Sequence, residues 1–389
     1  MKILHTSDWH LGVKTNGIDR LDEQKKVLEE ILSIANFENI DCVIIAGDVF
    51  NTSNPSAEAE ELFFDTIEKL SSNGDRFVFV LAGNHDDPTR IEAGIPLASK
   101  HNIALAGDLK KLKLNSFNPD SIVKVVETGR GYIKIQKNNE VATIGYLPYP
   151  SESRIKEKVD SELSYCEKVK YWSSIGANAF SDDSLNIFVS HLFMVGSKIK
   201  DSEVKVGDLL AVSKDCIPQA DYVALGHIHT PQTLGDNIYY SGAITALSTG
   251  QTELSVSVIE TENNTITNID NIKLNNIAKF EKVSINSIDE AESNLSKYDD
   301  KDIVELEIIQ NEPLSSFTLK QLKKDFPCVS SISLVRNYTD SSSVTTVKRK
   351  VLNDIDLFKS FYKDVRGFDA SDDLVEMFNQ CKGDENETA

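Results

Sequence analysis

The segment FVFVLAGNHDD, residues 77–87, joins a run of large apolar residues to a cluster of polar side chains through Gly83. A short apolar run bounded by glycine is typical of a strand that is buried on both faces of a sheet. The residues that follow, Asn84, His85 and Asp86, carry groups that bind metal ions or move protons. A buried strand that ends in such side chains predicts a functional site at the end of the strand.

Four other segments repeat the pattern of a β-forming run, a small residue and then Asp or His. They are KILHTSDWH (2–10), DCVIIAGD (41–48), NIFVSH (186–191) and YVALGHIH (222–229). Between the three N-terminal strands, residues 20–37 and 56–74 place their apolar side chains on one helical face, with Ser56 and Gly74 as start and stop signals of the second helix. This alternation predicts an α/β fold with a largely parallel region, in which the carboxyl ends of the strands meet at one edge.

The polar clusters contain the ligand types that a hard or borderline divalent cation prefers. They supply carboxylate, amide and imidazole groups and no thiolate, from Asp8, His10, Asp48, Asn84, His191, His227 and His229. Asp8 and His10 are two residues apart, so an extended segment would point both side chains to the same side. Seven ligands are too many for one ion and suit two ions with a bridging carboxylate, an arrangement that hydrolyses phosphate esters.

Each of these residues also has a structural explanation when it is taken alone. A single His or Asp at the end of a strand more often caps the strand or makes a hydrogen bond in the core. The joint pattern favours the metal site, because five of the seven histidines in the chain fall within these clusters.

The composition of the 389-residue chain is that of a globular protein with no membrane span. No apolar run approaches the roughly 20 residues of a membrane helix, and the N-terminal segment turns polar after Leu4, unlike a signal peptide. Five scattered cysteines form no CxxC pair, which favours a reducing cytoplasm. The net charge of −20 argues against nucleic-acid binding by the surface as a whole but leaves room for a local basic patch.

The pattern along the chain divides it into a large domain and several C-terminal parts. Residues 1–276 hold the five strand-end clusters, and residues 277–337 alternate strand-like and helical segments, which predicts a small α+β domain. Residues 338–353 have the composition of a linker, and residues 382–389 that of a disordered tail. Residues 354–381 predict two short amphipathic helices whose aromatic faces either dock on a partner or fold back on their own domain.

The motifs DWH, GDVF, GNHD, a solitary His and GHIH, in this order, resemble the signature of calcineurin-like metallophosphoesterases. The fuller strings ILHTSDWHLG, AGDVFNTSNPS, VSHLF and DYVALGHIHTPQ resemble the SbcD/Mre11 family of DNA nuclease subunits, strongly over residues 1–250 and more weakly beyond. The resemblance implies a calcineurin-like β-sandwich flanked by helices, a smaller α+β capping domain and C-terminal helices that bind a partner.

The same resemblance implies two ligand sets for two divalent ions, usually Mn²⁺, although the ligand types also admit iron, zinc or magnesium. One set is Asp8, His10, Asp48 and His229, and the other is Asp48, Asn84, His191 and His227, with Asp48 as the bridge. His85 is then the catalytic residue, which stabilises the transition state or protonates the leaving oxygen. The alternative is that His85 is only a solvent-facing neighbour of Asn84. Asp86 either orients His85 or caps the following turn.

The chain differs from the family pattern at positions that affect the binding of DNA. Asn51 follows GDVF where relatives often carry Asp or His, and Thr230 follows GHIH where a basic residue is common. The candidate contacts with DNA in this sequence are Lys14, Arg20, Arg90 and the segment 197–205.

The function that the resemblance implies is that of a nuclease subunit in DNA repair and recombination. It would cut DNA ends and hairpins, as exonuclease and endonuclease, together with an SbcC-type coiled-coil ATPase and as a homodimer within a heterotetramer. Two alternatives are a general metallophosphoesterase, acting on small nucleotides or phosphoproteins, and an inactive scaffold for the ATPase. The complete set of ligand residues argues against the scaffold, and the C-terminal parts argue against the general phosphoesterase. Leu62, Phe63 and Ile67 are candidate dimer contacts, but core packing explains these residues better.

Overall fold

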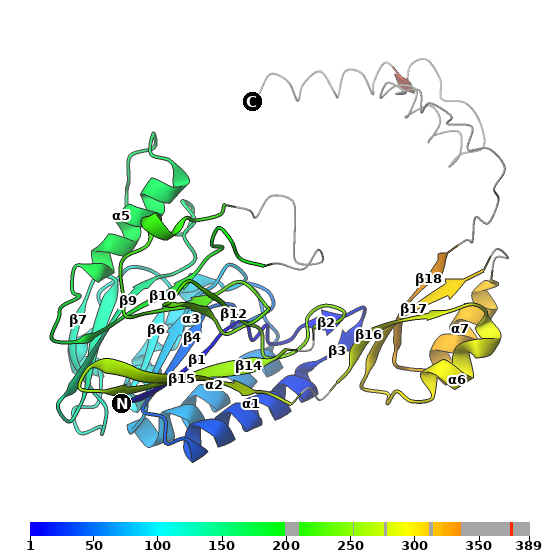
Figure 1. Ribbon diagram of the computed structural model, residues 1–389, viewed down its shortest axis with the longest axis horizontal. Helices are drawn as coiled ribbons and strands as arrows, with labels where there is room; N and C mark the ends of the chain where they lie inside the picture. Colours follow the sequence, from blue (N-terminus) through cyan, green and yellow to red (C-terminus); the bar gives the residue numbers. More distant parts are fainter. Residues whose placement is uncertain (199–209, 252, 276–277, 311–313, 336–373, 376–389) are drawn as a thin grey trace. The chain divides into compact units, whose positions relative to one another are not determined.

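The computed structural model describes residues 1–198, 210–251, 253–275, 278–310, 314–335 and 374–375 (Figure 1). Two sheets make up the larger part of it. The first has the strand order β15 (Thr265–Lys273), β14 (Ser255–Glu262), β1 (Lys2–Thr6), β4 (Cys42–Ala46), β5 (Phe77–Leu81) and β6 (Ile103–Ala106). The second has the order β12 (Gln232–Leu234), β13 (Ile238–Tyr240), β11 (Tyr222–Gly226), β10 (Leu185–His191), β9 (Glu140–Leu147), β8 (Tyr132–Lys137) and β7 (Lys124–Gly129).

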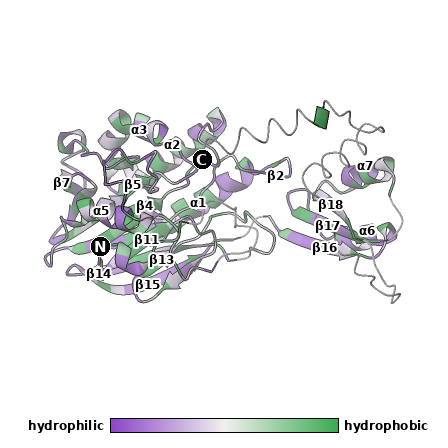
Figure 2. Cartoon of the chain, turned by 90° about the horizontal axis from the view of Figure 1, so that it is seen from above, coloured by the Kyte–Doolittle hydropathy of each residue, from purple (hydrophilic) through white to green (hydrophobic). Residues whose placement is uncertain are grey.

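Alternation of side chains along β4 shows how the layers are built. Cys42, Ile44 and Ala46 point into the core that the two sheets share. Val43 and Ile45 point to the other face, where they pack against helices α1 (Leu21–Phe37) and α2 (Ala57–Ser71). Helix α5 (Tyr165–Ala177) packs against β9 of the second sheet. Figure 2 shows hydrophobic residues along the strands, as expected for a sandwich that is covered by helices.

These layers confirm the expected α/β fold and the β-sandwich with flanking helices. Strands β1, β4, β5 and β6 pair in parallel, as do β9, β10, β11 and β13. Ser56 caps α2, because its side chain accepts a hydrogen bond from the backbone N–H of Ala59. The expected stop at Gly74 is wrong by a few residues: α2 ends at Ser71, and Ser72 takes the left-handed conformation with φ 51°. Among the candidate dimer contacts, Phe63 and Ile67 are buried in the core.

A third sheet lies C-terminal to the sandwich in the sequence. Its strands β16 (Phe280–Ile285), β17 (Ile303–Ile309) and β18 (Val329–Val335) pair in parallel, and α6 (Ala291–Leu295) and α7 (Ser316–Asp325) connect them. This sheet has a hydrophobic core of its own. Residues 1–336 group as one unit by their internal contacts, so a domain boundary at 276/277 stays a prediction.

The predicted linker 338–353, most of the predicted helices 354–381 and the tail 382–389 lie outside the described residues. The remaining short elements are β2 (Lys14–Thr15), β3 (Ile18–Asp19), α3 (Pro88–Ala93) and α4 (Ile95–Ala98). In the part of the chain that the structure describes, every helix is too short or too polar to cross a lipid bilayer.

Cys166 on α5 and Cys216 at the end of a 3₁₀ turn form a disulfide, with their Cα atoms 5.6 Å apart. Cysteine spacing does not predict this pair, because 50 residues separate the two cysteines. The closed loop includes β10 and its terminal His191. The disulfide therefore closes a loop of the chain that contains one predicted metal ligand.

We expect a reductant to lower the free energy of unfolding of the oxidised chain by about 4 kcal/mol, because the chain-entropy model gives this value for a loop of about 50 residues. Denaturant titration with and without dithiothreitol measures the change. Cys166→Ser should show the same loss and no further response to reductant. An assay of the unfolded, unreduced chain should find three free thiols among the five cysteines, and five free thiols would contradict the pairing.

Candidate metal centre

The five polar clusters lie at the carboxyl ends of strands from both sheets. Strands β1, β4 and β5 end just before the clusters that hold Asp8, Asp48 and Asn84. Strand β10 ends at His191, and β11 ends just before His227. The structure therefore brings together all seven of the predicted ligand residues, and it builds the candidate site from both layers of the sandwich.

The local backbone differs from the expected extended segments. Asp8, His10, Asp48 and His227 all have positive φ, at 52°, 45°, 50° and 93°. The expectation that alternation along a strand aligns Asp8 with His10 is therefore wrong: β1 has ended at Thr6, and left-handed turns aim the side chains. Each such residue costs on the order of 1–2 kcal/mol. Backbone hydrogen bonds hold the turns, because Asp8 N donates to Gly47 O and His10 N to Asp48 O, both at 3.0 Å.

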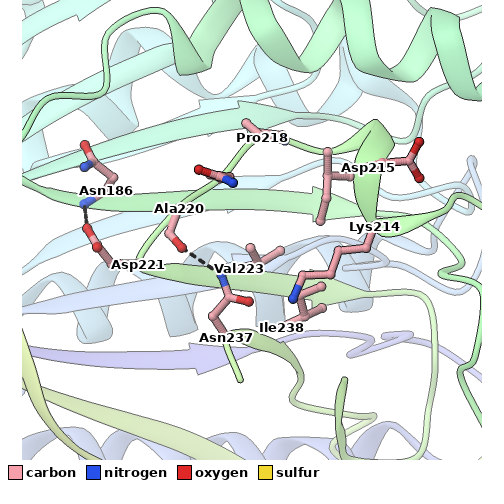
Figure 3. Close-up of a pocket in the computed structure, with 11 residues that line it drawn as sticks. Asn186, Lys214, Asp215, Pro218, Ala220, Asp221, Val223, Asn237 and Ile238 are labelled. Carbon is pink, nitrogen blue, oxygen red and sulfur yellow. Dashed lines mark hydrogen bonds between the residues drawn. The ribbon is translucent and has the colours of Figure 1, made fainter. Parts of the chain in front are cut away.

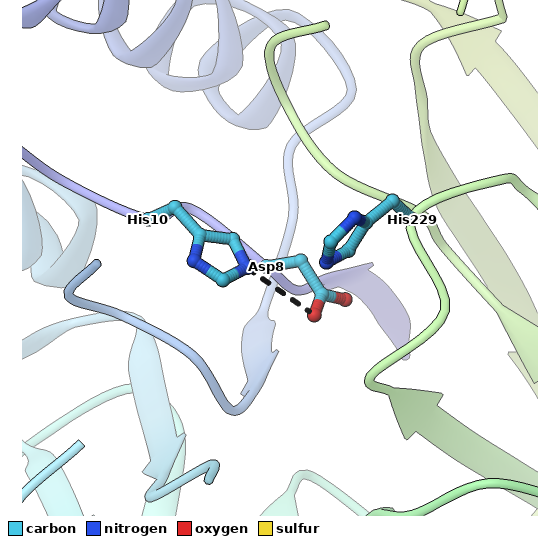
Figure 4. Close-up of side chains that lie close together, drawn as sticks. All are labelled: Asp8, His10 and His229. Atoms are coloured by element: carbon cyan, nitrogen blue, oxygen red, sulfur yellow. Dashed lines mark ion pairs between the residues drawn. The ribbon is translucent and has the colours of Figure 1, made fainter. Parts of the chain in front are cut away.

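One group of ligand atoms comes from Asp8, His10 and His229 (Figure 4). One atom from each lies within 4.8 Å of the others. His10 Nε2 lies 4.0 Å from Asp8 Oδ1 and 3.6 Å from Asp48 Oδ2. Both ring nitrogens of His10 are buried and have no hydrogen-bond partner among the described residues. A buried imidazole normally satisfies its nitrogens, so this orphaned ring fits a metal ligand.

A second group converges on the side-chain oxygen of Asn84. His191 Nε2 lies 3.0 Å from Asn84 Oδ1, and His227 Nδ1 lies 2.9 Å from the same oxygen. His191 Nε2 is also 3.2 Å from Asp48 Oδ2, while its Nδ1 donates to Ala46 O at 2.8 Å. The bond to Ala46 fixes the ring so that Nε2 faces the cluster. Asp48 therefore lies within reach of both groups, as a bridging ligand must.

The electrostatics of the cluster suit divalent cations. Burial lowers the pKa of His227 to about 3 and that of His10 well below its ordinary range, so both rings are neutral and carry a lone pair at pH 7. Burial raises the pKa of Asp8 to about 7. Burial opposes a proton on His191, yet Asp48 raises the pKa of that ring to about 9. The negative charge of Asp48, which favours a proton on His191 this strongly, favours a divalent cation at the same place for the same reason.

Asp86 holds two of the ligand loops together. Its carboxylate accepts hydrogen bonds from the backbone N–H groups of Gly83, Val49 and Phe50, at 2.8, 3.1 and 2.9 Å. The following helix α3 is capped by Asp87 instead. Neither role expected for Asp86 describes what it does, since it joins the turn after β5 to the turn after β4. Gly83 is required there, because a Cβ on it would lie 2.2 Å from Asp48 Oδ1.

His85 lies at the edge of the cluster and is half-buried. Its Nδ1 is 2.8 Å from Asn51 O, and its backbone N–H donates to Asp48 Oδ1 at 2.8 Å. Its ring centroid is 4.8 Å from that of His10. Asn51 orients the ring through its backbone carbonyl, so the residue type at position 51 does not matter for this contact. With Nδ1 engaged in this way, Nε2 is the nitrogen left for a substrate.

The candidate DNA contacts differ in their exposure and in their ion pairs. Arg20 is wrong as a contact, because it is buried, pairs with Glu23 at 2.6 Å and donates to Ala246 O at 2.7 Å. Arg90 pairs with Glu60 at 2.6 Å. Lys14 is exposed and stays a candidate. Most of the segment 197–205 lies outside the described residues.

An open cavity of about 870 Å³ lies at the opposite ends of the same strands (Figure 3). Its lining includes Asn186 near the start of β10 and Val223 near the start of β11. Two of the lining side chains make hydrogen bonds: Asp221 accepts from Asn186 N at 2.7 Å, and Asn237 Nδ2 donates to Ala220 O at 2.8 Å. The cavity holds none of the ligand residues and is separate from the metal centre.

Comparison with known proteins finds a matching domain family and relatives that align over the full length of the chain. The family model "Calcineurin-like phosphoesterase" matches residues 1–231. The SbcD subunit of the nuclease SbcCD from Bacillus subtilis is 31% identical and aligns over 100% of both chains. The chain belongs to the SbcD family of calcineurin-like phosphoesterases. The SbcD subunit of Staphylococcus epidermidis is 26% identical, over 94% of this chain and 93% of that one, and that of Staphylococcus saprophyticus is 25% identical, over 94% of each.

Membership of the family agrees with the geometry of the site. The SbcD-family chain is a metal-dependent phosphoesterase that uses divalent cations, and its orphaned His10 ring and convergent Asn84, His191 and His227 atoms fit such ions. Sequence motifs identify all seven ligand candidates and His85. They miss Arg154, which lies outside every motif and contacts the backbone of the GNHD turn.

Proposed function

We propose that the chain is an SbcD-like nuclease subunit that hydrolyses phosphodiester bonds at DNA ends and hairpins. The observation that carries the proposal is that Asp48 Oδ2 lies between the two groups of ligand atoms, 3.6 Å from His10 Nε2 of one group and 3.2 Å from His191 Nε2 of the other. The full-length similarity to the SbcD subunit of the nuclease SbcCD supports DNA as the substrate over a small nucleotide or a phosphoprotein. A general metallophosphoesterase would need the sandwich but has no evident use for the C-terminal third of the chain.

We assign each residue one role. Asp8, His10 and His229 hold one ion, Asn84, His191 and His227 hold the other, and Asp48 bridges them. Two divalent ions would supply hydroxide from bound water and offset the charge of the transferring phosphoryl group. His85 donates a proton to the leaving oxygen from Nε2, while Asn51 O holds its Nδ1 at 2.8 Å. The half-buried position of His85 supports this role, because the ring reaches both the cluster and solvent.

The proposed metal is Mn²⁺, and the proposed partners are DNA and an SbcC-type coiled-coil ATPase, in a heterotetramer that contains two copies of this chain and acts in the cytoplasm. The net charge of −20 supports a partner that supplies most of the affinity for DNA. The amphipathic pattern of residues 354–381 supports helices that lie in a groove of that ATPase.

We expect the purified chain to degrade end-labelled duplex DNA and to hydrolyse bis(p-nitrophenyl) phosphate with Mn²⁺, and to lose both activities with EDTA. The ligand set is the reason, because without cations the hydroxide and the charge compensation are missing. Gel analysis of the DNA and absorbance of p-nitrophenol measure the two reactions. Adding back Mn²⁺, Mg²⁺, Zn²⁺ or Fe²⁺ separately after EDTA ranks the metals.

The substrate comparison separates the two candidate functions. Cleavage of DNA ends and hairpins, with or without the ATPase, supports the nuclease. Hydrolysis of the small ester with no cleavage of DNA, even in the presence of the ATPase, would favour the general metallophosphoesterase. Tight binding of duplex DNA by the isolated chain at physiological salt would contradict the proposal that the ATPase supplies the affinity.

A further inference from the structure

The side chain of Arg154 makes hydrogen bonds with the backbone of the turn that carries Asn84 and His85. It lies in the segment that follows β9, and its guanidinium donates three hydrogen bonds to main-chain carbonyl oxygens. Nη1 donates to Gly83 O and Asp86 O, both at 2.8 Å, and Nη2 donates to Asn84 O at 2.6 Å. One side chain therefore fixes the direction of three of the four peptide units in the turn.

The hydrogen bonds of Arg154 go to main-chain carbonyl oxygens, as most of those of Arg76 also do. The guanidinium of Arg154 forms no ion pair among the described residues. A guanidinium has five N–H donors, of which these contacts use three. Arg130, in contrast, pairs with Glu157 on the surface. The position of Arg154 is thus explained by the carbonyl oxygens of the turn and by no acidic partner.

Tyr149 extends this contact to the second sheet. Its backbone N–H donates to Ala82 O at 3.2 Å, and its ring lies 6.0 Å from the ring of His227 and 6.4 Å from that of His191. The Arg154 guanidinium lies 5.7 Å from the centroid of the Tyr149 ring. The segment 149–154 therefore touches the turn after β5 on one side and two ligands of the second sheet on the other.

We propose that Arg154 is a positioning residue for Asn84 and His85. By holding the carbonyl oxygens of Gly83, Asn84 and Asp86, it keeps Asn84 Oδ1 at 3.0 and 2.9 Å from His191 Nε2 and His227 Nδ1. The hydrogen bond from Arg154 to Asn84 O also orients the peptide group between Asn84 and His85, and the N–H of this group donates to Asp48 Oδ1. Arg154 thus acts through the turn, and its loss shifts both the second metal ligand set and His85.

The proposal rests on the proposed phosphodiesterase chemistry, so its test includes a measurement that needs no catalysis. In Arg154→Ala we expect isothermal titration with Mn²⁺ to show about tenfold weaker binding at one of two sites. We expect kcat to fall by a factor of roughly 10–100 on bis(p-nitrophenyl) phosphate and on DNA, with KM unchanged, because misplacement of reacting groups lowers the rate of the chemical step. Guanidinium ion at millimolar concentration should restore part of the activity, and Arg154→Lys should be intermediate.

Arg130→Ala is the matched control, since it removes an exposed arginine that pairs with Glu157, and we expect no change in it. A raised KM with unchanged kcat would overturn the proposal, because Arg154 would then bind substrate directly. Unchanged kcat and Mn²⁺ binding would overturn it as well. If Arg154→Ala does not fold, Arg154→Lys carries the same comparison. A wild-type chain that cleaves the small ester but never DNA would end the nuclease proposal and leave the test of Arg154 intact.

Discussion

Replacement of Asp48 by asparagine should reduce Mn²⁺-dependent hydrolysis of DNA and of the small phosphodiester on the order of 10³-fold. The side chain keeps its size but loses the negative charge that lies within reach of both ligand groups, 3.6 Å from His10 Nε2 and 3.2 Å from His191 Nε2. Charge stabilisation by a metal pair contributes several kcal/mol to a phosphoryl-transfer transition state, and about 4 kcal/mol corresponds to this change in rate. Steady-state kinetics measures the rate, and titration calorimetry measures Mn²⁺ uptake.

Asp41→Asn is the matched control, because Asp41 lies just before the other end of the same strand. Its carboxylate accepts hydrogen bonds from Lys2 N at 2.9 Å and from Lys137 Nζ at 2.6 Å. Strand β4 separates Asp41 from Asp48 in the sequence. This variant should lose some stability and keep its kcat. If Asp48→Asn binds two Mn²⁺ ions with unchanged affinity and retains its rate, Asp48 is not the bridging ligand.

Replacement of His85 by alanine should lower kcat on DNA by roughly 10²–10⁴-fold, the usual contribution of a general acid. Mn²⁺ binding should change little, because His85 contributes a neighbouring group and not one of the proposed ligands. The backbone N–H that donates to Asp48 Oδ1 remains in the variant, so the turn keeps this contact. The exposed His101 offers a matched His101→Ala control with no expected effect.

The nature of the leaving group tests the role of His85 more sharply. The DNA leaving group is an alkoxide that needs a proton, whereas p-nitrophenolate leaves without one. We therefore expect His85→Ala to lose much less activity on bis(p-nitrophenyl) phosphate than on DNA. An equal loss on both substrates would assign His85 to charge stabilisation of the phosphoryl group, and full activity on DNA would remove it from the mechanism.

Sequence patterns predict the members of the site better than the backbone that arranges them. The ends of parallel strands meet at one sheet edge, so the strand pattern alone groups Asp48 with Asn84. The left-handed turn at Asp8 is not predictable in this way, because non-glycine residues rarely adopt positive φ and nothing in DWH indicates it. The division of the ligands between two sheets depends on long-range packing, which strand patterns do not encode.

Errors in the sequence interpretation have definite physical causes. Arg20 is expected at the surface because charged residues are seldom buried, yet Glu23 and the carbonyl of Ala246 pair it in the interior. Arg154 gives no signal, since its partners are carbonyl oxygens of residues about 70 positions away, which any sequence offers equally. The Cys166–Cys216 pair likewise depends on the packing of α5 against a 3₁₀ turn far along the chain.

The placement of the ligands in both sheets has a consequence for how the protein tolerates change. Asp8, Asp48 and Asn84 follow strands of one sheet, while His191 ends a strand of the other sheet and His227 follows one. The two sheets that carry these sets pack through one shared core, to which Ile44 and Phe79 of the first sheet and Ile187 and Val189 of the second belong. Because a close-packed interior transmits strain, we expect a substitution that changes the volume of this core to change the spacing of the ligands as well.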